Sequence, residues 1–304
     1  MKLAEESIVR NRFHTSAGRR NSKLSAFVVG HKELDLRLCL LSSDLLLLHE
    51  ETIPDRVAEL KQSIIEDGVV KDPIIVDTSS HVILDGMHRV AALRELHCLY
   101  IPVCEVDYAD PSIRVGVWYR TLSGRVDLSQ LASALSASGI KIVKAPADVS
   151  TVAENSPLAV VSANGECLRM DGIGWQVYEI LKVAERCVRE LGFSVGFETE
   201  SDALKRLISR KIDAIITVPK IDKALVREAG LSGRLLPHKV TRHIIPARPL
   251  SVNVPLKMLT AKDTTLKETN EKFVSSLQTR RMTQRPSGTV IEGRRYEEET
   301  FIFH

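Results

Sequence analysis

The sequence is poor in the features that define secreted, membrane-spanning and zinc-binding proteins. Its five cysteines are odd in number and form no C-x-x-C pair, so we expect neither a disulfide framework nor a zinc ribbon. The longest apolar run, residues 45–48, is too short to cross a bilayer. The polar N-terminus also lacks the apolar stretch of a secretory signal. We therefore expect a cytoplasmic protein with reduced thiols and no membrane contact.

Several catalytic signatures are also missing. There is no G-x-x-x-x-G-K-[ST] phosphate loop, no His-Arg-Asp loop followed by Asp-Phe-Gly, no H-E-x-x-H and no G-x-S-x-G. A phosphotransferase of a common class is thereby disfavoured. The 42 basic and 39 acidic residues leave a net charge of +3. This balance disfavours a dedicated DNA-binding protein, because such proteins usually carry a marked basic excess.

The length of 304 residues predicts about two domains of roughly 150 residues each. Residues 1–25 contain several arginines and few apolar positions, which is typical of a solvated, flexible basic arm. A boundary signal follows at Leu122-Ser123-Gly124. We expect a first domain over 26–124, a second over 125–258 and a C-terminal extension over 259–304.

Apolar spacing predicts mixed α/β structure in the first domain. Pro54 fits the start of a helix and Gly68 fits its end. Two short β-rich runs, 73–76 and 81–84, are expected to pair as a hairpin. A second amphipathic helix after Gly86 and a further strand complete the pattern.

The second domain shows the same alternation. Asn164-Gly165 is a strong turn signal between two β-rich runs. Helices are expected over 128–138, 178–191, 201–209 and 223–228, and strands over 158–161, 166–170 and 214–218. The fold class is therefore α/β (α+β). In the extension we expect one helix over 266–277 and a strand near 301–303.

The segment Asp85-Gly86-Met87-His88-Arg89 carries the first candidate chemistry. A strand ends there, glycine allows a tight turn, and a helix begins whose free N–H groups favour an anion. Arg89 offers a planar fork for phosphate, and His88 can carry a proton near neutrality. The alternative is purely structural: Asp85 caps the helix and Arg89 is a surface charge.

Two loop carboxylates, Glu50 and Glu51, follow His49 just before the first helix. Such carboxylates are usually solvated, but one beside an anion site is a sensible general base or a ligand for a phosphate-bound cation.

Two further groups of side chains have both a functional and a structural interpretation. The segment Lys239-Val240-Thr241-Arg242-His243 is either a second anion clamp or a solvated basic loop. Trp118-Tyr119 is either part of the core or one wall of a small pocket.

Taken together and in order, these segments resemble the ParB/sulfiredoxin-like superfamily. Met87 stands where sulfiredoxin has its catalytic cysteine, so that activity is not expected. Within the superfamily, the chain is most similar to the free L-serine kinases over about residues 36–258. The matches are His49-Glu50 to the H-E loop, residues 85–89 to D-G-H-H-R, Trp118-Tyr119 to a tryptophan-tyrosine pair, and residues 239–246 to K-x-T-R-H-x-x-P. Met87 replaces the first histidine of D-G-H-H-R, and no counterpart can be placed for the extension.

The resemblance implies phosphorylation of the hydroxyl of free L-serine, with ADP or ATP as donor and Mg²⁺ as cofactor. It implies a ParB/sulfiredoxin-like N-terminal domain and a second α/β domain that closes over a cleft. It also implies three groups of site residues. The catalytic residues are Glu50 as general base, Asp85 and His88. The nucleotide and its phosphates are bound by Val69, Gly86, Met87, His88 and Arg89. The substrate is bound by Ser63, Trp118, Lys239, Thr241, Arg242 and His243, and Asp85 is also a candidate ligand for the metal.

Two other functions remain open from the sequence. One is a nucleotide-dependent DNA-binding or regulatory protein like those of the partition branch, which the basic arm and a pI near 8.5 support. The other is a kinase of a different small hydroxyl compound. The sequence does not indicate the oligomeric state.

Overall fold

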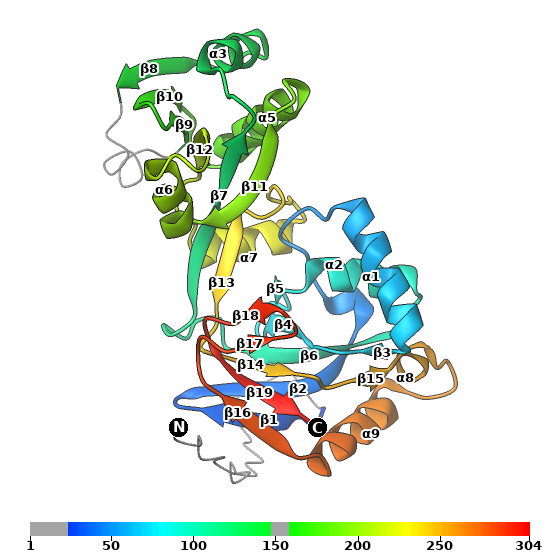
Figure 1. Cartoon of the computed structure of the whole chain (residues 1–304). Helices are drawn as coiled ribbons and strands as arrows, with labels where there is room; N and C mark the ends of the chain where they lie inside the picture. Colours follow the sequence, from blue (N-terminus) through cyan, green and yellow to red (C-terminus); the bar gives the residue numbers. More distant parts are fainter. Residues whose placement is uncertain (1–23, 147–157) are drawn as a thin grey trace, which may run out of the picture. The chain divides into compact units, whose positions relative to one another are not determined.

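A computed structural model of the chain describes residues 24–146 and 158–304. It divides into two compact units (Figure 1). Unit 1 consists of Met1–Arg114, Lys223–Leu235 and His243–His304, and unit 2 consists of Val115–Asp222 and Leu236–Arg242. The predicted basic arm lies almost entirely outside the described residues.

The unit boundaries differ from the predicted ones for a structural reason. Strands β7 (Arg114–Ser123) and β13 (Thr241–Ile244) pair with each other, and the units divide within both of them. The turn signal at Gly124 therefore marks the end of β7. The C-terminal extension belongs to unit 1 rather than forming a separate part.

The main sheet of unit 1 has the strand order β1-β2-β6-β4-β5. Its neighbours pair antiparallel except for β4 and β6, which pair parallel. Most of its residues are buried, which matches the β-rich apolar runs of the sequence. The strands are β1 (Phe27–His31), β2 (Leu34–Ser42), β4 (Ile74–Asp77), β5 (Ile83–Asp85) and β6 (Tyr100–Val106).

Two helices of unit 1 confirm the sequence signals in detail. Helix α1 (Pro54–Asp67) begins at the proline and ends at Gly68, whose φ of 65° is left-handed. Helix α2 (Met87–Glu95) follows Gly86 and packs against α1. The predicted hairpin is confirmed as β4 paired with β5. Between β2 and α1 lies a short 3-10 turn, η1 (Ser43–Leu45).

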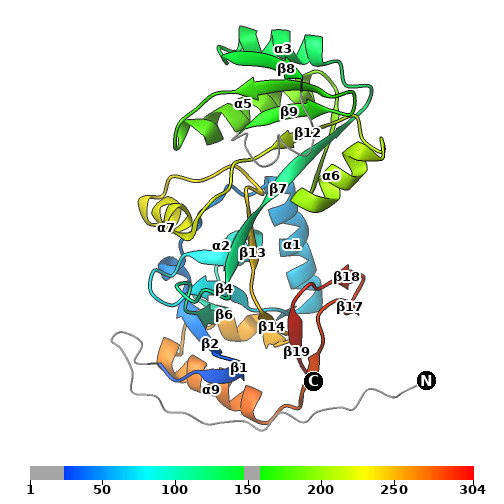
Figure 2. The same ribbon diagram turned by 90° about the vertical axis from the view of Figure 1, so that its left-hand side faces the viewer.

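The C-terminal segment of unit 1 forms a second, three-stranded sheet in the order β14-β19-β16. Its strands are β14 (Ala247–Leu250), β16 (Met282–Arg285) and β19 (Glu299–Phe303), so the predicted terminal strand is confirmed. Helix α9 (Leu266–Gln278), also predicted, packs against β1 and β2, and both ribbon views show it beside them (Figures 1 and 2). The remaining elements are β3 (Val69–Val70), α7 (Lys223–Ser232), β15 (Val254–Pro255), α8 (Leu256–Thr260), β17 (Val290–Ile291) and β18 (Arg294–Arg295).

Unit 2 contains a sheet in the order β11-β7-β12-β9-β10-β8, with β13 added beside β7. The predicted Asn164-Gly165 hairpin is confirmed as β9 paired antiparallel with β10. Helix α3 packs against α5, and α6 packs against β11 and β12. The elements are α3 (Leu128–Ala137), β8 (Ile142–Pro146), β9 (Ala159–Ser162), β10 (Glu166–Met170), α5 (Gln176–Glu190), β11 (Ser194–Thr199), α6 (Glu200–Ile208) and β12 (Ala214–Thr217).

Both units mix helices with sheets, so the predicted α/β class is confirmed. Across the described residues, no helix is long and apolar enough to span a membrane.

Asn270 of α9 joins the edge of the main sheet and yields a prediction about stability. Its buried carboxamide accepts a hydrogen bond from Leu40 N at 2.7 Å and donates one to Ser25 O at 2.7 Å, two residues beyond the last β1–β2 pair. Asn270→Leu fills the space but leaves the buried Leu40 N–H without its acceptor. We expect the free energy of unfolding to fall by about 1–3 kcal/mol, measured by urea denaturation.

The matched control is Glu271→Gln, at the next position of α9 on an exposed side chain. It should unfold at the urea concentration of the unaltered protein. Equal midpoints for the two variants would contradict the bridging role of Asn270.

Candidate active site

Strand β5 positions three of the polar side chains of unit 1. His49 Nδ1 donates a hydrogen bond to Ile83 O at 2.7 Å. The ring of His243 bonds to the backbone of the next residue, Leu84. Asp85 ends the strand. The rings of His49 and His243 meet edge to face, with centroids 5.5 Å apart.

Both imidazoles are neutral at physiological pH. Burial lowers the pKa of His49 from 6.5 to about 4. Burial, and secondarily the neighbouring His49, places the pKa of His243 well below its ordinary value. The hydrogen bond to the backbone of Leu84 favours the protonated ring, so the ring nitrogen of His243 donates in that bond. The other nitrogen, His243 Nε2, accepts from Tyr108 Oη at 2.8 Å.

Tyr108 is itself fixed by helix α7. Lys223 Nζ lies 5.2 Å and Arg227 Cζ lies 5.6 Å from the centroid of its ring, within cation–π range. Arg227 also forms an ion pair with the buried carboxylate of Asp77, at the end of β4. The orientation of His243 thus depends on residues more than a hundred positions apart in the chain.

Glu50 is buried, although loop carboxylates are usually solvated. Only 3% of its surface is exposed, and its Oε1 lies 3.9 Å from His49 Nε2. Because His49 is neutral, that ring does not neutralise the carboxylate. A buried carboxylate beside polar side chains has the surroundings of a proton acceptor.

Asp85 is held by two arginines, both on Oδ2. Arg89 Nη2 donates at 3.0 Å and Arg248 Nη1 donates at 2.8 Å. Arg89 in turn donates to Asp72 O and Pro73 O at 2.9 and 3.1 Å. Arg89 is therefore not a free surface charge, and its guanidinium is not reserved for binding a phosphate.

Gly86 is required at the turn between β5 and α2. Its φ is 102°, and an added Cβ would lie 2.7 Å from Ile74 Cδ1 and 3.0 Å from Arg89 Nη2. Gly86, rather than Asp85, is the N-cap of α2, so the N-cap residue has no side chain to bond to the first turn. The structural alternative, in which Asp85 caps the helix, does not describe this turn.

The remaining predicted residues of unit 1 occupy different places. His88 Nε2 accepts from Ile53 N at 3.0 Å, which ties α2 to the loop before α1. Ser63 lies on the exposed face of α1 and donates to Asp67 at 3.3 Å. Val69 pairs with Pro255 between β3 and β15. Met87 is the first residue of α2.

Unit 2 contains a cluster of its own around Trp118. Lys239 Nζ lies 5.3 Å and Arg242 Cζ lies 5.9 Å from the ring centroid of Trp118. Buried Arg120 donates to the backbone oxygens of residues 118, 238 and 239, which fixes the turn that presents Lys239. Thr241 and Arg242 lie on β13, so this part of the segment is a strand and not a solvated loop, which was one of its two interpretations. His243, predicted to act from the second domain, lies in unit 1.

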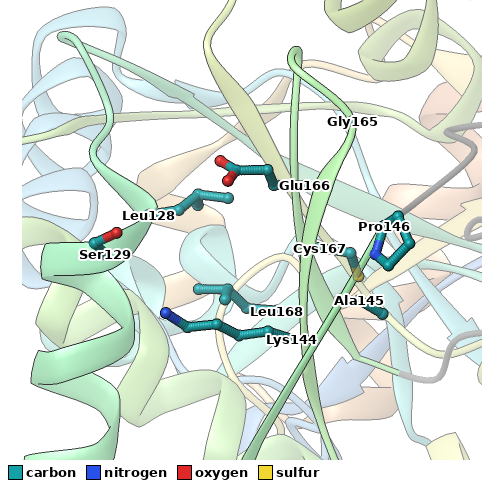
Figure 3. A pocket seen from close by; sticks show the side chains of 9 residues that line it. All are labelled: Leu128, Ser129, Lys144, Ala145, Pro146, Gly165, Glu166, Cys167 and Leu168. Atoms are coloured by element: carbon teal, nitrogen blue, oxygen red, sulfur yellow. The ribbon is translucent and has the colours of Figure 1, made fainter.

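A pocket of about 340 Å³ lies elsewhere in unit 2, between the start of α3 and strands β8 and β10 (Figure 3). Lys144, Glu166 and the buried Cys167 are among its lining residues. None of the predicted site residues lines it. The group at the end of β5 therefore shares no residue with this pocket.

Two side chains that complete the group at the end of β5 were missed by the sequence interpretation. Tyr108 follows β6, and Arg248 lies on β14, between Pro246 and Pro249 in the sequence. No local pattern marks either residue, because each acts on a partner more than 130 positions away.

Comparisons with known proteins agree with the resemblance stated above. No protein-family model matches the chain. The chain is 31% identical over 229 residues to an ATP-dependent L-serine kinase of Staphylothermus marinus, covering 72% of this chain and 90% of that protein. It is 23% identical over 216 residues to an ADP-dependent L-serine kinase of Thermococcus kodakarensis, covering 69% and 88%. A solved free serine kinase in complex with AMP shares the fold, with a TM-score of 0.64, 21% identity, and coverage of 73% and 93%.

The low pKa of His49 predicts how stability depends on pH. Between pH 6.5 and about 4 the unfolded chain binds a proton at His49 that the folded chain does not, so stability falls as the pH is lowered through this window. The full difference between the two pKa values corresponds to about 3 kcal/mol in the free energy of unfolding. His49→Asn keeps an N–H donor for Ile83 O but does not titrate. We expect it to lose less stability than the unaltered protein between pH 7 and pH 5 in urea denaturation.

His97→Asn is the control, because His97 is exposed and follows α2. It should show the pH dependence of the unaltered protein. If His49→Asn shows that same dependence, His49 is not buried in its neutral form.

Proposed function

The chain belongs to the family of L-serine kinases, and we propose that it transfers a phosphoryl group from ATP or ADP to the hydroxyl of free L-serine. The products would be O-phospho-L-serine and ADP or AMP. The observation that carries this proposal is the group at the end of β5, where Glu50 is buried beside a neutral imidazole and Asp85 is held by two arginines. We also propose a cytoplasmic location, which the five free, buried cysteines support.

Glu50 is the proposed general base. It takes the hydroxyl proton of serine as the serine oxygen attacks the terminal phosphorus. An oxygen–phosphorus bond forms, the bond from phosphorus to the bridging oxygen breaks, and the nucleotide leaves with the electron pair. Burial of Glu50 keeps water from competing for this proton transfer.

The start of α2 is the proposed phosphate site. The first turn of α2 presents the backbone N–H groups of Met87, His88 and Arg89, and its N-cap residue is a glycine. Such groups point toward a common spot and bind phosphate oxygens. Since His88 Nε2 already accepts from Ile53 N, we assign His88 chiefly to holding the loop that carries Glu50.

Mg²⁺ would neutralise the phosphoryl oxygens during transfer. Within residues 24–146 and 158–304, no three His, Cys, Asp or Glu side chains gather into a metal site. The cation would therefore be held mainly by the phosphates of the nucleotide. Oδ2 of Asp85 accepts from two guanidinium groups, which favours an orienting role for this residue over coordination by that oxygen.

The substrate contacts remain predictions. Trp118, Lys239 and Arg242 gather positive charge beside an aromatic face, which suits the carboxylate of an amino acid. Ser63, Thr241 and the nucleotide contact at Val69 rest on the resemblance alone.

Glu50→Gln tests the general base. The amide keeps the size of the side chain but cannot take the proton, so we expect kcat to fall by roughly 10²–10⁴-fold. Purified protein is mixed with L-serine, Mg²⁺ and either nucleotide, and phosphoserine is measured by mass spectrometry. The same run identifies the donor, because it shows whether AMP or ADP is released.

Calorimetric titration with the nucleotide should give a similar affinity for Glu50→Gln and the unaltered protein. Glu59→Gln, on the exposed face of α1, is the matched control and should keep its kcat. Turnover of Glu50→Gln at the unaltered rate would exclude Glu50 as the base. Salt-sensitive DNA binding without any phosphotransfer would instead favour the DNA-binding alternative.

A further inference from the structure

Arg248 connects Asp85 to the C-terminal segment of the chain. Its side chain is 8% exposed. Nη1 donates to Asp85 Oδ2 at 2.8 Å, and Nε donates to Oε1 of Glu298, whose side chain is 12% exposed. One buried guanidinium thus joins a candidate catalytic carboxylate to a second carboxylate, 213 residues further along the chain by their numbering.

The C-terminal sheet determines where Glu298 lies. Strands β14 and β19 pair parallel, with Arg248 opposite Thr300 and Ala247 opposite Glu299. Glu298 immediately precedes β19, and Glu299 N donates to Pro246 O at 3.3 Å. Arg280 reinforces the sheet by donating to Val252 O and Ser251 O, which follow β14, at 2.6 and 2.8 Å. Glu298 is therefore placed by backbone pairing rather than by a flexible loop.

The charges around Arg248 balance only when Glu298 is included. Arg89 and Arg248 both donate to the one oxygen of Asp85. Without Glu298, two guanidinium groups would share a single carboxylate, and Nε of a buried arginine would lose its acceptor. Leaving such a charged donor unsatisfied is costly, so the arginine would shift toward another partner. Asp85 would then lose the contact that fixes it from β14.

We propose that Glu298 is a positioning residue for the phosphoryl transfer: it holds Arg248, and Arg248 holds the Asp85 carboxylate in its working orientation. This inference rests on the proposed function for its kinetic consequence. It assigns a role to the segment 259–304, for which the sequence alone indicates no function. The sheet β14-β19-β16 becomes part of the support of the active site.

Glu298→Gln is the direct test, because it keeps the size of the side chain and removes its charge. Displacement of Asp85 should lower kcat for phosphoserine formation by roughly 10- to 100-fold. The KM for serine and the affinity for nucleotide should stay within about twofold, because the loss is confined to the transition state. Glu271→Gln, the same change on the exposed face of α9, should leave kcat unaltered.

A double variant separates positioning from general loosening of the fold. If Glu298 acts only through Arg248, adding Glu298→Gln to Arg248→Met should lower kcat no further. If the double variant instead loses kcat by the product of the two separate effects, Glu298 acts by another route. An unaltered kcat in Glu298→Gln would overturn the inference outright.

Hydrogen exchange keeps the inference testable if the proposed function fails. Peptides covering residues 83–89 should exchange faster in Glu298→Gln than in Glu271→Gln, whether or not serine is the substrate. Equal exchange in the two variants would overturn the positioning role. If the unaltered protein makes no phosphoserine but this difference is present, the proposed function fails while the link to Asp85 stands.

Discussion

A polar group buried at the end of β5 needs a partner, and most of the candidate site follows from this constraint. His49 and His243 bond to the backbone of consecutive residues of that strand. Asp85, whose side chain is 33% exposed, accepts from both Arg89 and Arg248, and buried Arg248 in turn needs the carboxylates of Asp85 and Glu298. These contacts therefore connect the three-residue strand β5 to the C-terminal sheet β14-β19-β16. The C-terminal segment is therefore a structural condition of the site.

The same burial decides which groups can carry a proton. An exposed histidine would titrate near neutrality, but burial keeps His49 neutral down to a pKa of about 4. His243 is neutral as well and takes its hydrogen bond from Tyr108. Because their low pKa values make both imidazoles weak bases, we propose the adjacent Glu50 as the group that accepts the proton of a substrate hydroxyl. A carboxylate in a loop is usually solvated, but tertiary packing buries Glu50.

Helix ends and turns could be predicted from local sequence patterns, whereas contacts between residues far apart in the chain could not. Pro54 and Gly68 marked the ends of α1, and Asn164-Gly165 marked the β9–β10 hairpin, because turn and cap geometry depends on a few neighbouring residues. The turn at Gly86 was also recognised. The contact of Arg248 with Asp85 could not be, since it depends on the pairing of β14 with β19. For the same reason, the roles that the resemblance implies for the other site residues remain predictions, because the structure shows only where these residues lie.

These contacts converge at Asp85, and its substitution by asparagine is the most informative test of the proposed site. Asp85→Asn preserves shape, and the fold can tolerate it because Arg248 keeps Glu298 and Arg89 keeps the carbonyls of Asp72 and Pro73. The measurement is the rate of phosphoserine formation from L-serine and the preferred nucleotide, in a variant shown to be folded and to bind nucleotide. We expect a fall of at least about 100-fold, because the variant loses the group proposed to orient the reacting atoms. A rate equal to that of the unaltered protein would show that Asp85 does not have this role.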